Sequence, residues 1–234
     1  MSENKRTNDP KGVRRRIVDA AYDAFVTQGY LATGMLELRE KASVSGGAMA
    51  HHFPVKRDLG LAVIRDRVAD AVRQTWIEPL RAYEDTWAAI DLIFKDIIAE
   101  LTQRDRVSGC PLNNIAMEVS AHDAEMRELV SAVFGAWHEA LSASFKADVK
   151  AKRAQDLDPQ KTATLVIAAY SGAMAMARAR QDVGPLNDCR TELAALLAAK
   201  YRRPCPTMIS QRRKKPHAGS PEESEPVSRH EQFK

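Results

Sequence analysis

Residues 31–53 read LATGMLELREKASVSGGAMAHHF, a stretch in which two short helical patterns meet at a tight turn. The first pattern covers residues 36–42 and directs Leu38 inward. The second covers residues 45–52, and its first residue, Ser45, carries a hydroxyl that can cap a helix. Helices joined by so short a turn cross steeply, which leaves the second free to enter a DNA major groove. The stretch therefore predicts a helix-turn-helix.

The sequence on either side of this motif has a helical pattern too. Upstream, Asp9 and Pro10 supply a cap and a first-turn proline, and apolar residues then recur at helical spacing as far as Gly29. Downstream, a long pattern starts near Lys56 and continues to Trp76. This fourth helix would join a small head to the rest of the chain, where it could act as a lever.

The remaining sequence predicts helices and no strands. After Pro79, helices are expected at about 86–103, 112–119, 124–151, 159–181 and 186–201. No stretch shows sustained alternation with strand-type turns. The predicted fold is all-α, with an N-terminal three-helix helix-turn-helix domain followed by a helical bundle. The expected division of the chain is a basic arm at 1–13, the helix-turn-helix domain at 14–57, the bundle at 58–203 and a disordered tail at 204–234.

The composition fits a soluble globular protein, since 44% of the 234 residues are hydrophobic and 28% are charged. No apolar run approaches the roughly 20 residues needed to cross a bilayer, and the polar start lacks the apolar core of a signal peptide. We therefore expect a cytoplasmic protein with no membrane partner. Three cysteines, Cys110, Cys189 and Cys205, cannot all pair within one chain, and we expect free thiols.

Basic residues gather at the amino end. The formal net charge is only +4, but Lys and Arg greatly outnumber Asp and Glu over residues 5–16. A mobile basic arm would be drawn to phosphates, whereas the plainer interpretation is a solvated terminus. A second basic run, residues 211–215, lies in the tail and is open to the same two interpretations.

Several short elements follow one another in a specific order. They are Ile17-Val-Asp-Ala-Ala-Tyr-Asp-Ala-Phe25, Gly29-Tyr30, Ala32-Thr33, Val44-Ser45, Gly47, His51-His-Phe-Pro54 and Lys56. In order and spacing this series resembles the DNA-binding domain of the TetR family of bacterial repressors, from about Arg14 to Ile64. Residues 109–120 are similar to the pocket region of some family members.

The resemblance implies a homodimeric repressor that a small molecule releases from DNA, with the bundle as the ligand-binding and dimerisation domain. The last two long helices would pair with their copies across a twofold axis, and the small apolar residues at 168–177 suit such close approach. Two recognition helices would then enter successive major grooves, about 34 Å apart, on palindromic double-stranded DNA. A ligand bound in the bundle would tilt the fourth helix, and the two recognition helices would then no longer match the spacing of the major grooves.

The candidate DNA contacts fall into two groups. Those expected nearest the bases are Ser45, Gly46, Gly47, Ala48 and His51, and those expected at phosphates are Arg14, Thr33, His52 and Lys56. Met49 and Phe53 point the other way and should hold the helix in the domain. Family members often carry donors or an aromatic residue where this chain has Gly46, Ala48 and Ala50. We therefore expect specificity to depend on backbone contacts and DNA shape, with a steep dependence on salt.

The turn of the motif departs from the family pattern at two positions. Arg39 stands where a small residue is usual, and we expect its side chain to extend outward along its methylene stem and add a phosphate contact. Ser43 replaces the glycine favoured for a left-handed conformation.

The candidate ligand residues offer aromatic and thioether surface to a partly apolar small molecule. They are Phe94, Cys110, Asn113, Met117, Trp137, Tyr170 and Met174. Such residues at helical spacing are more often plain core, so this set depends on the resemblance. A thiol- or electrophile-sensing repressor is an alternative, because Cys110 precedes Pro111 at a helix start, where backbone N–H groups lower a thiol pKa.

The main rival function is that of a helical interaction protein with a degenerate DNA-binding head. An enzyme is not expected, because nothing brings Cys110, His122 and Asp123 together as nucleophile, base and orienter. A metal site at His51 and His52 is not expected either, because neighbouring helical side chains diverge by about 100° and a third ligand is missing. No phosphate-binding loop or cofactor motif is present, so no cofactor is expected.

Overall fold

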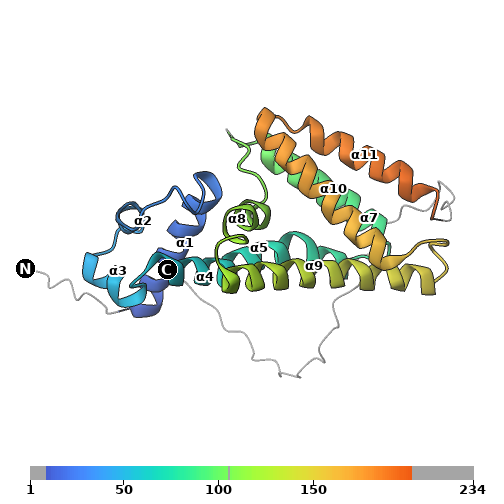
Figure 1. Ribbon diagram of the computed structural model, residues 1–234. Helices are drawn as coiled ribbons and strands as arrows, with labels where there is room; N and C mark the ends of the chain where they lie inside the picture. The colour runs from blue at the N-terminus through green and yellow to red at the C-terminus, as the bar shows by residue number, and fades with distance from the viewer. Residues whose placement is uncertain (1–8, 105, 202–234) are drawn as a thin grey trace, which may run out of the picture.

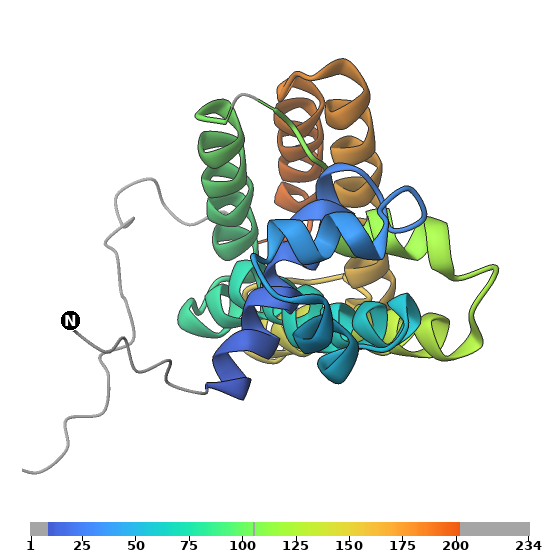
Figure 2. The same ribbon diagram turned by 90° about the vertical axis from the view of Figure 1, so that its left-hand side faces the viewer.

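The computed structural model describes residues 9–104 and 106–201, and its regular elements are helices (Figure 1). They are α1 (Pro10–Thr27), α2 (Met35–Lys41), α3 (Gly46–His52), α4 (Lys56–Val63), η1 (Ile64–Val68), α5 (Ala69–Val72), η2 (Arg73–Ile77), α6 (Glu78–Ala82), α7 (Thr86–Thr102), α8 (Pro111–Val119), α9 (Ala124–Lys150), α10 (Pro159–Arg180) and α11 (Gly184–Ala198). Helices α1 to α3 form a head at one end, and α7 to α11 form a bundle at the other (Figures 1 and 2). The predicted all-α fold is confirmed.

The head is built on α1, which starts and stops where its sequence predicts. The Gly12 N–H donates to Asp9 Oδ1 at 2.9 Å, which caps the first turn. The buried face of α1 consists of Ile17, Val18, Ala21, Ala24, Phe25 and Val26. After the helix, Gly29 takes φ +104°, a conformation that favours glycine. The chain therefore turns at Gly29 towards α2.

Helices α2 and α3 form the predicted helix-turn-helix. Leu38 is fully buried, and Ser43 in the turn has φ +52°, the left-handed conformation expected at that position. Ser45 is the N-cap of α3, since its Oγ accepts the Ala48 N–H at 3.1 Å. Met49 is buried on the inner side of α3, which fixes this helix to the head.

A single long helix, here called the lever helix, runs from Lys56 to Ala82 and joins the head to the bundle. It changes its winding twice, because the Ala69 N–H donates to the Ile64 carbonyl and the Glu78 N–H to the Arg73 carbonyl, each five residues back. These π-helical turns are η1 and η2.

The lever helix continues past Pro79, although its pattern in the sequence is followed only to Trp76. Pro79 lies in the first turn of α6, directly after η2, and the helix continues to Ala82. A proline has no N–H to donate and clashes with the carbonyl four residues back in a regular α-helix. The π-helical turn before Pro79 shifts the hydrogen-bond register at that point, so the helix passes the proline without a break.

The bundle packs α9 along the lever helix and α10 against both α9 and α11, while α11 also contacts α7 (Figure 1). The predicted bundle helices are confirmed to within a few residues at each end. Its core is centred on large side chains that are buried almost completely, namely Trp76, Phe94, Leu112, Trp137, Leu141 and Phe145. None of the helices in the described ranges could span a membrane.

A buried carboxylate ties three parts of the bundle together. Asp148 near the end of α9 is fully buried and accepts the Thr86 N–H at 3.0 Å, the Tyr201 hydroxyl at 2.6 Å and Arg153 Nε at 2.8 Å. It thereby joins the end of α9, the start of α7 and the last described residue. Because every oxygen of this buried group is paired, the position of Tyr201 is well defined.

The expected domain boundaries need correction at the amino end. Residues 10–13, assigned to the basic arm, form the first turn of α1, because Asp9 and Pro10 start the helix there. The expected boundary between 57 and 58 falls inside α4. The expectations for the arm before residue 9, for Cys205, for the tail at 204–234 and for its basic run all concern chain outside the described residues.

Candidate nucleic-acid interface and ligand cavity

Helix α3 presents small side chains on its outer surface. Ser45, Gly46, Gly47 and His51 are exposed, and Ala48 is half-buried. A Cβ built on Gly47 would meet nothing within 4 Å, and one on Gly46 would meet only Arg39 Nη1, at 3.9 Å. Packing within the head therefore does not require these glycines. They leave room for another molecule to approach the backbone of α3 closely.

Arg14 extends from α1 at the edge of the head. Its Nη1 lies 2.9 Å from Asp66 Oδ2 on the lever helix, and its guanidinium lies 5.4 Å from the centroid of the Phe53 ring. Arg14 is exposed in this pairing. It therefore remains available to an anion that competes with Asp66.

Lys56 is the first residue of the lever helix, which follows α3 in the chain. Its Nζ donates to the Leu31 carbonyl at 3.3 Å and lies 4.6 Å from the centroid of the Tyr30 ring. Partial burial lowers the pKa of Lys56, although Glu118 acts in the opposite direction. His52, also expected at a phosphate, is half-buried at the end of α3.

The expected phosphate contact from Thr33 is corrected by the structure. Thr33 is only 1% exposed, and its Oγ1 donates to the Gly29 carbonyl at 2.7 Å. The hydroxyl closes the turn after α1 and is not presented to a partner. Arg39 is partly exposed with its nearest carboxylate, Glu40, at 3.5 Å, so its phosphate contact stays a prediction.

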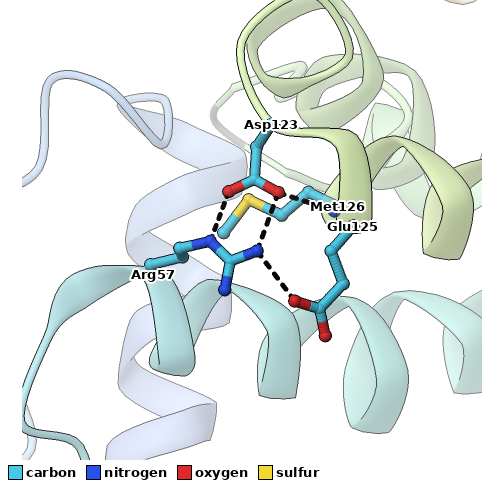
Figure 3. Close-up of polar contacts among 4 residues, drawn as sticks. All are labelled: Arg57, Asp123, Glu125 and Met126. Atoms are coloured by element: carbon cyan, nitrogen blue, oxygen red, sulfur yellow. Dashed lines mark hydrogen bonds and ion pairs between the residues drawn. The ribbon is translucent and has the colours of Figure 1, made fainter.

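Arg57 joins the lever helix to the start of α9 (Figure 3). Its Nε donates to Asp123 Oδ2 at 2.6 Å, and its Nη2 donates to Asp123 Oδ1 at 3.2 Å and to Glu125 Oε2 at 2.7 Å. Asp123 Oδ1 also accepts the Met126 N–H at 3.0 Å, which caps α9. The hydrogen bonds from Arg57 hold the pKa of Asp123 below its usual value, with help from the Met126 N–H. We call these four residues the Arg57 clamp.

Close packing at Gly60 accompanies the clamp. A Cβ built on Gly60 would lie 2.5 Å from Met126 Cε of the bundle and 2.8 Å from Tyr30 Cε2 of the head. Only a glycine lets these two side chains meet at the lever helix. The head, the lever helix and the bundle therefore meet at Gly60.

Helix α8 makes a second connection to the head. Glu118 Oε2 accepts the Leu31 N–H at 2.7 Å. Asn114 Nδ2 donates to the carbonyl of Val26 at 3.3 Å and to that of Ser108 at 2.8 Å. The sequence offers no signal for either pairing, because the partners are more than 80 residues apart for Leu31 and Val26.

Four aromatic rings pack together at the centre of the bundle. The ring centroid of Trp76 lies 4.7 Å from that of Trp137 and 4.9 Å from that of Tyr170. The ring centroids of Phe94 and Tyr170 lie 5.8 Å apart. A cavity of about 40 Å³ adjoins this cluster, lined by Val68, Ala71, Val72, Thr75, Trp76, Cys110, Pro111, Leu112, Trp137 and Tyr170. Pockets that hold small molecules typically have about 300–1,000 Å³. The helices must therefore separate before a ligand of ordinary size can enter.

The polar groups at this cavity are few. Trp137 Nε1 is buried and has no hydrogen-bond partner within the described part of the chain. Burial raises the pKa of Tyr170 well above its ordinary value, so its hydroxyl stays protonated. No charged side chain is among the lining residues. The cavity thus offers mostly apolar surface, and the hydrogen-bonding side chains among its lining residues are Thr75, Trp76, Cys110, Trp137 and Tyr170.

Three of the expected ligand residues, Cys110, Trp137 and Tyr170, line this cavity, and Phe94 packs against Tyr170 beside it. Phe94, Cys110, Trp137, Tyr170 and Met174 are all buried in one core. Asn113 is half-buried, and its Nδ2 donates to the Ser171 carbonyl at 3.3 Å. The expected set lacks Trp76, although the spacing of Val68, Val72 and Trp76, four residues apart, gives a signal for it.

Met117, which was expected to contact ligand, does not line this cavity and is 85% exposed. Leu112, Ile115 and Val119 define the buried face of α8. Met117 lies five residues after Leu112, about 140° round the helix from it, and so falls outside that face.

The thiol-sensing alternative is not supported at Cys110. Burial raises the pKa of this thiol, although the backbone N–H groups of Asn113 and Leu112 act in the opposite direction. The helix start is present, but desolvation outweighs it. His122 is exposed beyond the far end of α8, and Asp123 is paired with Arg57, so the three residues do not form the nucleophile, base and orienter of an enzyme.

Comparisons with known proteins match both parts of the chain. Residues 17–63 match the family model for bacterial regulatory proteins of the tetR family, and residues 86–192 match the model for the C-terminal domain of LmrA/YxaF-like transcriptional regulators. The HTH-type transcriptional regulator LmrA of Bacillus subtilis is 21% identical over 74% of this chain and 90% of its own length. An uncharacterised HTH-type regulator of Mycobacterium tuberculosis is 27% identical over 81% of this chain and 96% of its own length.

Solved structures share the whole fold. A TetR transcriptional regulator from Chloroflexus aurantiacus has a TM-score of 0.74 at 26% identity, covering 82% of this chain and 98% of that one. A regulator from Saccharomonospora viridis in complex with choline has a TM-score of 0.69 at 18% identity, covering 82% of this chain and 100% of that one. The second likeness concerns the fold alone.

Proposed function

Because the chain belongs to the TetR family of bacterial transcriptional regulators, we propose that it is a homodimeric repressor released from a palindromic operator by a small, partly apolar molecule. The observation that carries this proposal is the outer surface of α3, where Gly46 and Gly47 are exposed without any packing role in the head. A recognition helix that enters a major groove needs such an uncovered surface.

Two apolar helix faces at the far end of the bundle support the dimer. On α10, Leu165 and Met176 are 47% and 48% exposed, and Leu196 on α11 is 57% exposed. Ala168 and Gly172 lie between the first two at helical spacing, and a Cβ on Gly172 would meet nothing within 4 Å. We call these five residues the dimer face. A second copy that covers it would remove this apolar surface from water.

The proposed DNA contacts are assigned to residues that are exposed or half-buried on the head and at the start of the lever helix. Ser45, Gly46, Gly47, Ala48 and His51 would lie nearest the bases, and Arg14, His52 and Lys56 nearest the phosphates. Few of the residues near the bases carry hydrogen-bond donors, so shape and backbone contacts would carry much of the specificity. Thr33 is left out, because its hydroxyl is bonded internally.

Ligand entry would reach the head through two of the four helices that line the aromatic cavity, the lever helix and α8. The lever helix contributes Trp76 to the cavity and Arg57 to the clamp. Helix α8 contributes Leu112 to the cavity and Glu118 to the contact with the head. A molecule that separates these helices would favour a different position of the head, and DNA would favour the original position.

The test is DNA binding by the purified full-length protein. Selection from random DNA should recover palindromes, and fluorescence anisotropy on a selected site should give an affinity that falls steeply with salt. A monomer with no preference for any oligonucleotide at low ionic strength would contradict the proposal and favour the interaction-protein alternative. If the logarithm of the affinity hardly changes with the logarithm of the salt concentration, the proposed phosphate contacts are contradicted.

Effector binding is tested separately, on the protein–DNA complex. Trp76 and Trp137 border the cavity, so a molecule that enters it should change tryptophan fluorescence. The same molecule should release DNA, and Trp137→Phe should weaken its effect by removing the unpartnered N–H. Release of DNA without any fluorescence change would place the effector elsewhere.

A further inference from the structure

A groove of about 790 Å³ lies between α9 and the end of the lever helix. A row of alanines on α9, namely Ala136, Ala140, Ala143 and Ala147, lines one side, and Ile77, Leu80 and Tyr83 line the other. None of the residues that line this groove borders the aromatic cavity. We call it the alanine groove.

The alanine groove is an apolar surface that lacks a partner within the described residues. Ala136, Ala143 and Ala147 are exposed, and Ala140 is half-buried. They recur along α9 at helical spacing and form a strip roughly 16 Å long. Because each is small, the strip leaves space that a larger side chain would fill.

The described chain ends beside this groove. The Tyr201 hydroxyl donates to Asp148 at 2.6 Å, and Asp148 also pairs with Arg153, which lines the groove. Tyr201 also forms an isolated antiparallel bridge with Ala154. The chain after Tyr201 therefore starts at the end of the groove nearest Ala147.

The next residues of the chain have the composition that such a groove would bind. They read Arg202-Arg-Pro-Cys-Pro-Thr-Met-Ile209, and within five residues this segment holds Cys205, Met208 and Ile209, three of the six hydrophobic side chains of residues 202–234. Two prolines favour an extended conformation, which reduces the entropy lost on binding. At about 3.3 Å per residue, residues 204–209 extend roughly 20 Å, enough to follow the strip.

The charges agree with this arrangement. Glu84 and Glu139 line the groove together with Arg81, and no ion pair joins any of these three to another residue in 9–104 and 106–201, so unpaired carboxylates outnumber unpaired guanidinium groups there. Arg202 and Arg203 directly follow Tyr201. Arg153, the cation at that end of the groove, is already paired with Asp148. The arginines of the tail would supply the missing partners.

We propose that residues 204–209 of the chain's own tail bind in the alanine groove. Ile77 and Leu80 of the groove belong to the lever helix, so the bound segment holds the far end of that helix against α9. The proposal concerns a different surface from the DNA interface, the aromatic cavity and the dimer face. It stands or falls separately from the proposed function.

Cys205 reports on this binding directly. In the full-length protein, its alkylation by iodoacetamide is followed by mass spectrometry of the peptide that contains it. We expect it to react about tenfold more slowly than the same cysteine in a synthetic peptide of residues 202–210, as for a segment that is bound about nine-tenths of the time. Ala140→Arg, which fills the groove, should remove this protection.

Two controls keep the result interpretable. Ala88→Arg places the same side chain at an exposed position outside the groove and should leave the protection unchanged. Cys110 is buried and should stay unreactive in every variant that is folded. The proposal is overturned if Cys205 reacts as fast as the peptide, if Ala140→Arg changes nothing in a folded protein, or if the protection disappears on dilution, which would indicate a second copy.

Discussion

At the level of single residues, Arg57 joins the start of the lever helix, directly behind the head, to the bundle. Its guanidinium binds two carboxylates, and one of them, Asp123, also caps α9. Exposed ion pairs usually contribute little to stability. The bidentate geometry to Asp123 is the favourable case, because it fixes orientation as well as distance. The clamp is therefore expected to matter more for the position of the head than for the stability of the fold.

Removing the charge of Asp123 should change how stability depends on pH. Folding lowers the pKa of Asp123, so the clamp stabilises the protein above the ordinary aspartate pKa of about 3.9 and loses this effect as pH falls through the lowered value. Asp123→Asn keeps a good N-cap but loses the ion pair. The difference in urea midpoint between the two proteins should be largest near neutral pH and shrink as the pH falls below the ordinary aspartate value.

Asp85→Asn is the matched control for this measurement. Asp85 caps α7 by accepting the Ala88 N–H at 2.8 Å, and it has no ion-pair partner in the part of the chain that the structure describes. Its variant should show a smaller difference from the wild type. Equal differences for the two variants would mean that the cap, and not the bond to Arg57, sets the pH dependence.

The same substitution should act in opposite directions at two glycines. At Gly60 a methyl group would press on Met126 and Tyr30, and such overpacking costs typically 1–3 kcal/mol, against a gain in helix propensity of about 1 kcal/mol. Gly60→Ala should therefore lower the free energy of unfolding. Gly47→Ala meets open space and should raise it by up to about 1 kcal/mol. Denaturant unfolding of both variants measures the signs.

Gly47→Ala has a second consequence if α3 lies close to DNA. The variant should bind a selected operator more weakly while it unfolds at higher denaturant, because the methyl group occupies the space that the DNA backbone or base edges need. Stronger binding together with higher stability would count against a close approach at this position.

At the level of elements, the turn between α2 and α3 contains a strained backbone conformation that glycine would adopt at lower cost. Ser43 has φ +52°, which costs a side chain of this kind about 1 kcal/mol or more. Ser43→Gly should therefore stabilise the protein by up to about 1 kcal/mol. Ser131→Gly on the exposed side of α9 should destabilise it by roughly 0.5 kcal/mol, since φ is helical there. Thermal unfolding of the pair checks the opposite signs.

The lever helix and α8 differ in how they connect the two parts of the molecule. The lever helix is covalently continuous with the head and passes Pro79 by means of η2. Helix α8 is not covalently continuous with the head; it packs against α1, and the side chains of Asn114 and Glu118 bond to the head. Movement of α8 can therefore break its contacts with the head, whereas movement of the lever helix must carry the head with it.

At the level of the whole molecule, the proposed dimer would have to hold its two heads at a fixed separation to bind adjacent grooves. Ala168→Arg places a long charged side chain in the dimer face and should give a monomer in sedimentation experiments. Because two linked sites gain about 10²–10⁴ in affinity over one, the variant should bind a palindrome at least about 100-fold more weakly. Ala88→Arg, outside that face, should keep both the mass and the affinity of the wild type. A monomeric wild-type protein that binds equally well would rule out the dimer.

The head was the part most fully predictable from the sequence. Its helix ends depend on neighbouring residues, so Asp9, Gly29 and Ser45 mark them without knowledge of the fold. Helical spacing also predicts the buried sides of α1 and α3. The turn at Ser43 is predicted for the same reason, because a left-handed residue is a property of the local backbone.

The functional contacts depend on packing between distant segments. Arg57 and Asp123 are 66 residues apart, and no sequence pattern around either residue predicts that the two side chains pair. Thr33 is polar in the sequence but buried, whereas Met117 is apolar but exposed. Residue type predicts neither result, because exposure depends on which face of an element the rest of the molecule covers.

The sequence by itself therefore determined the all-α class, the helix-turn-helix and most helix ends, since these follow from interactions within a few residues. Only the tertiary structure decided that Trp76 joins the aromatic cluster, that burial keeps Cys110 from being an acidic thiol and that α8 contacts the head. Each of these depends on desolvation or pairing between groups far apart in the chain, which arise only when the helices pack together.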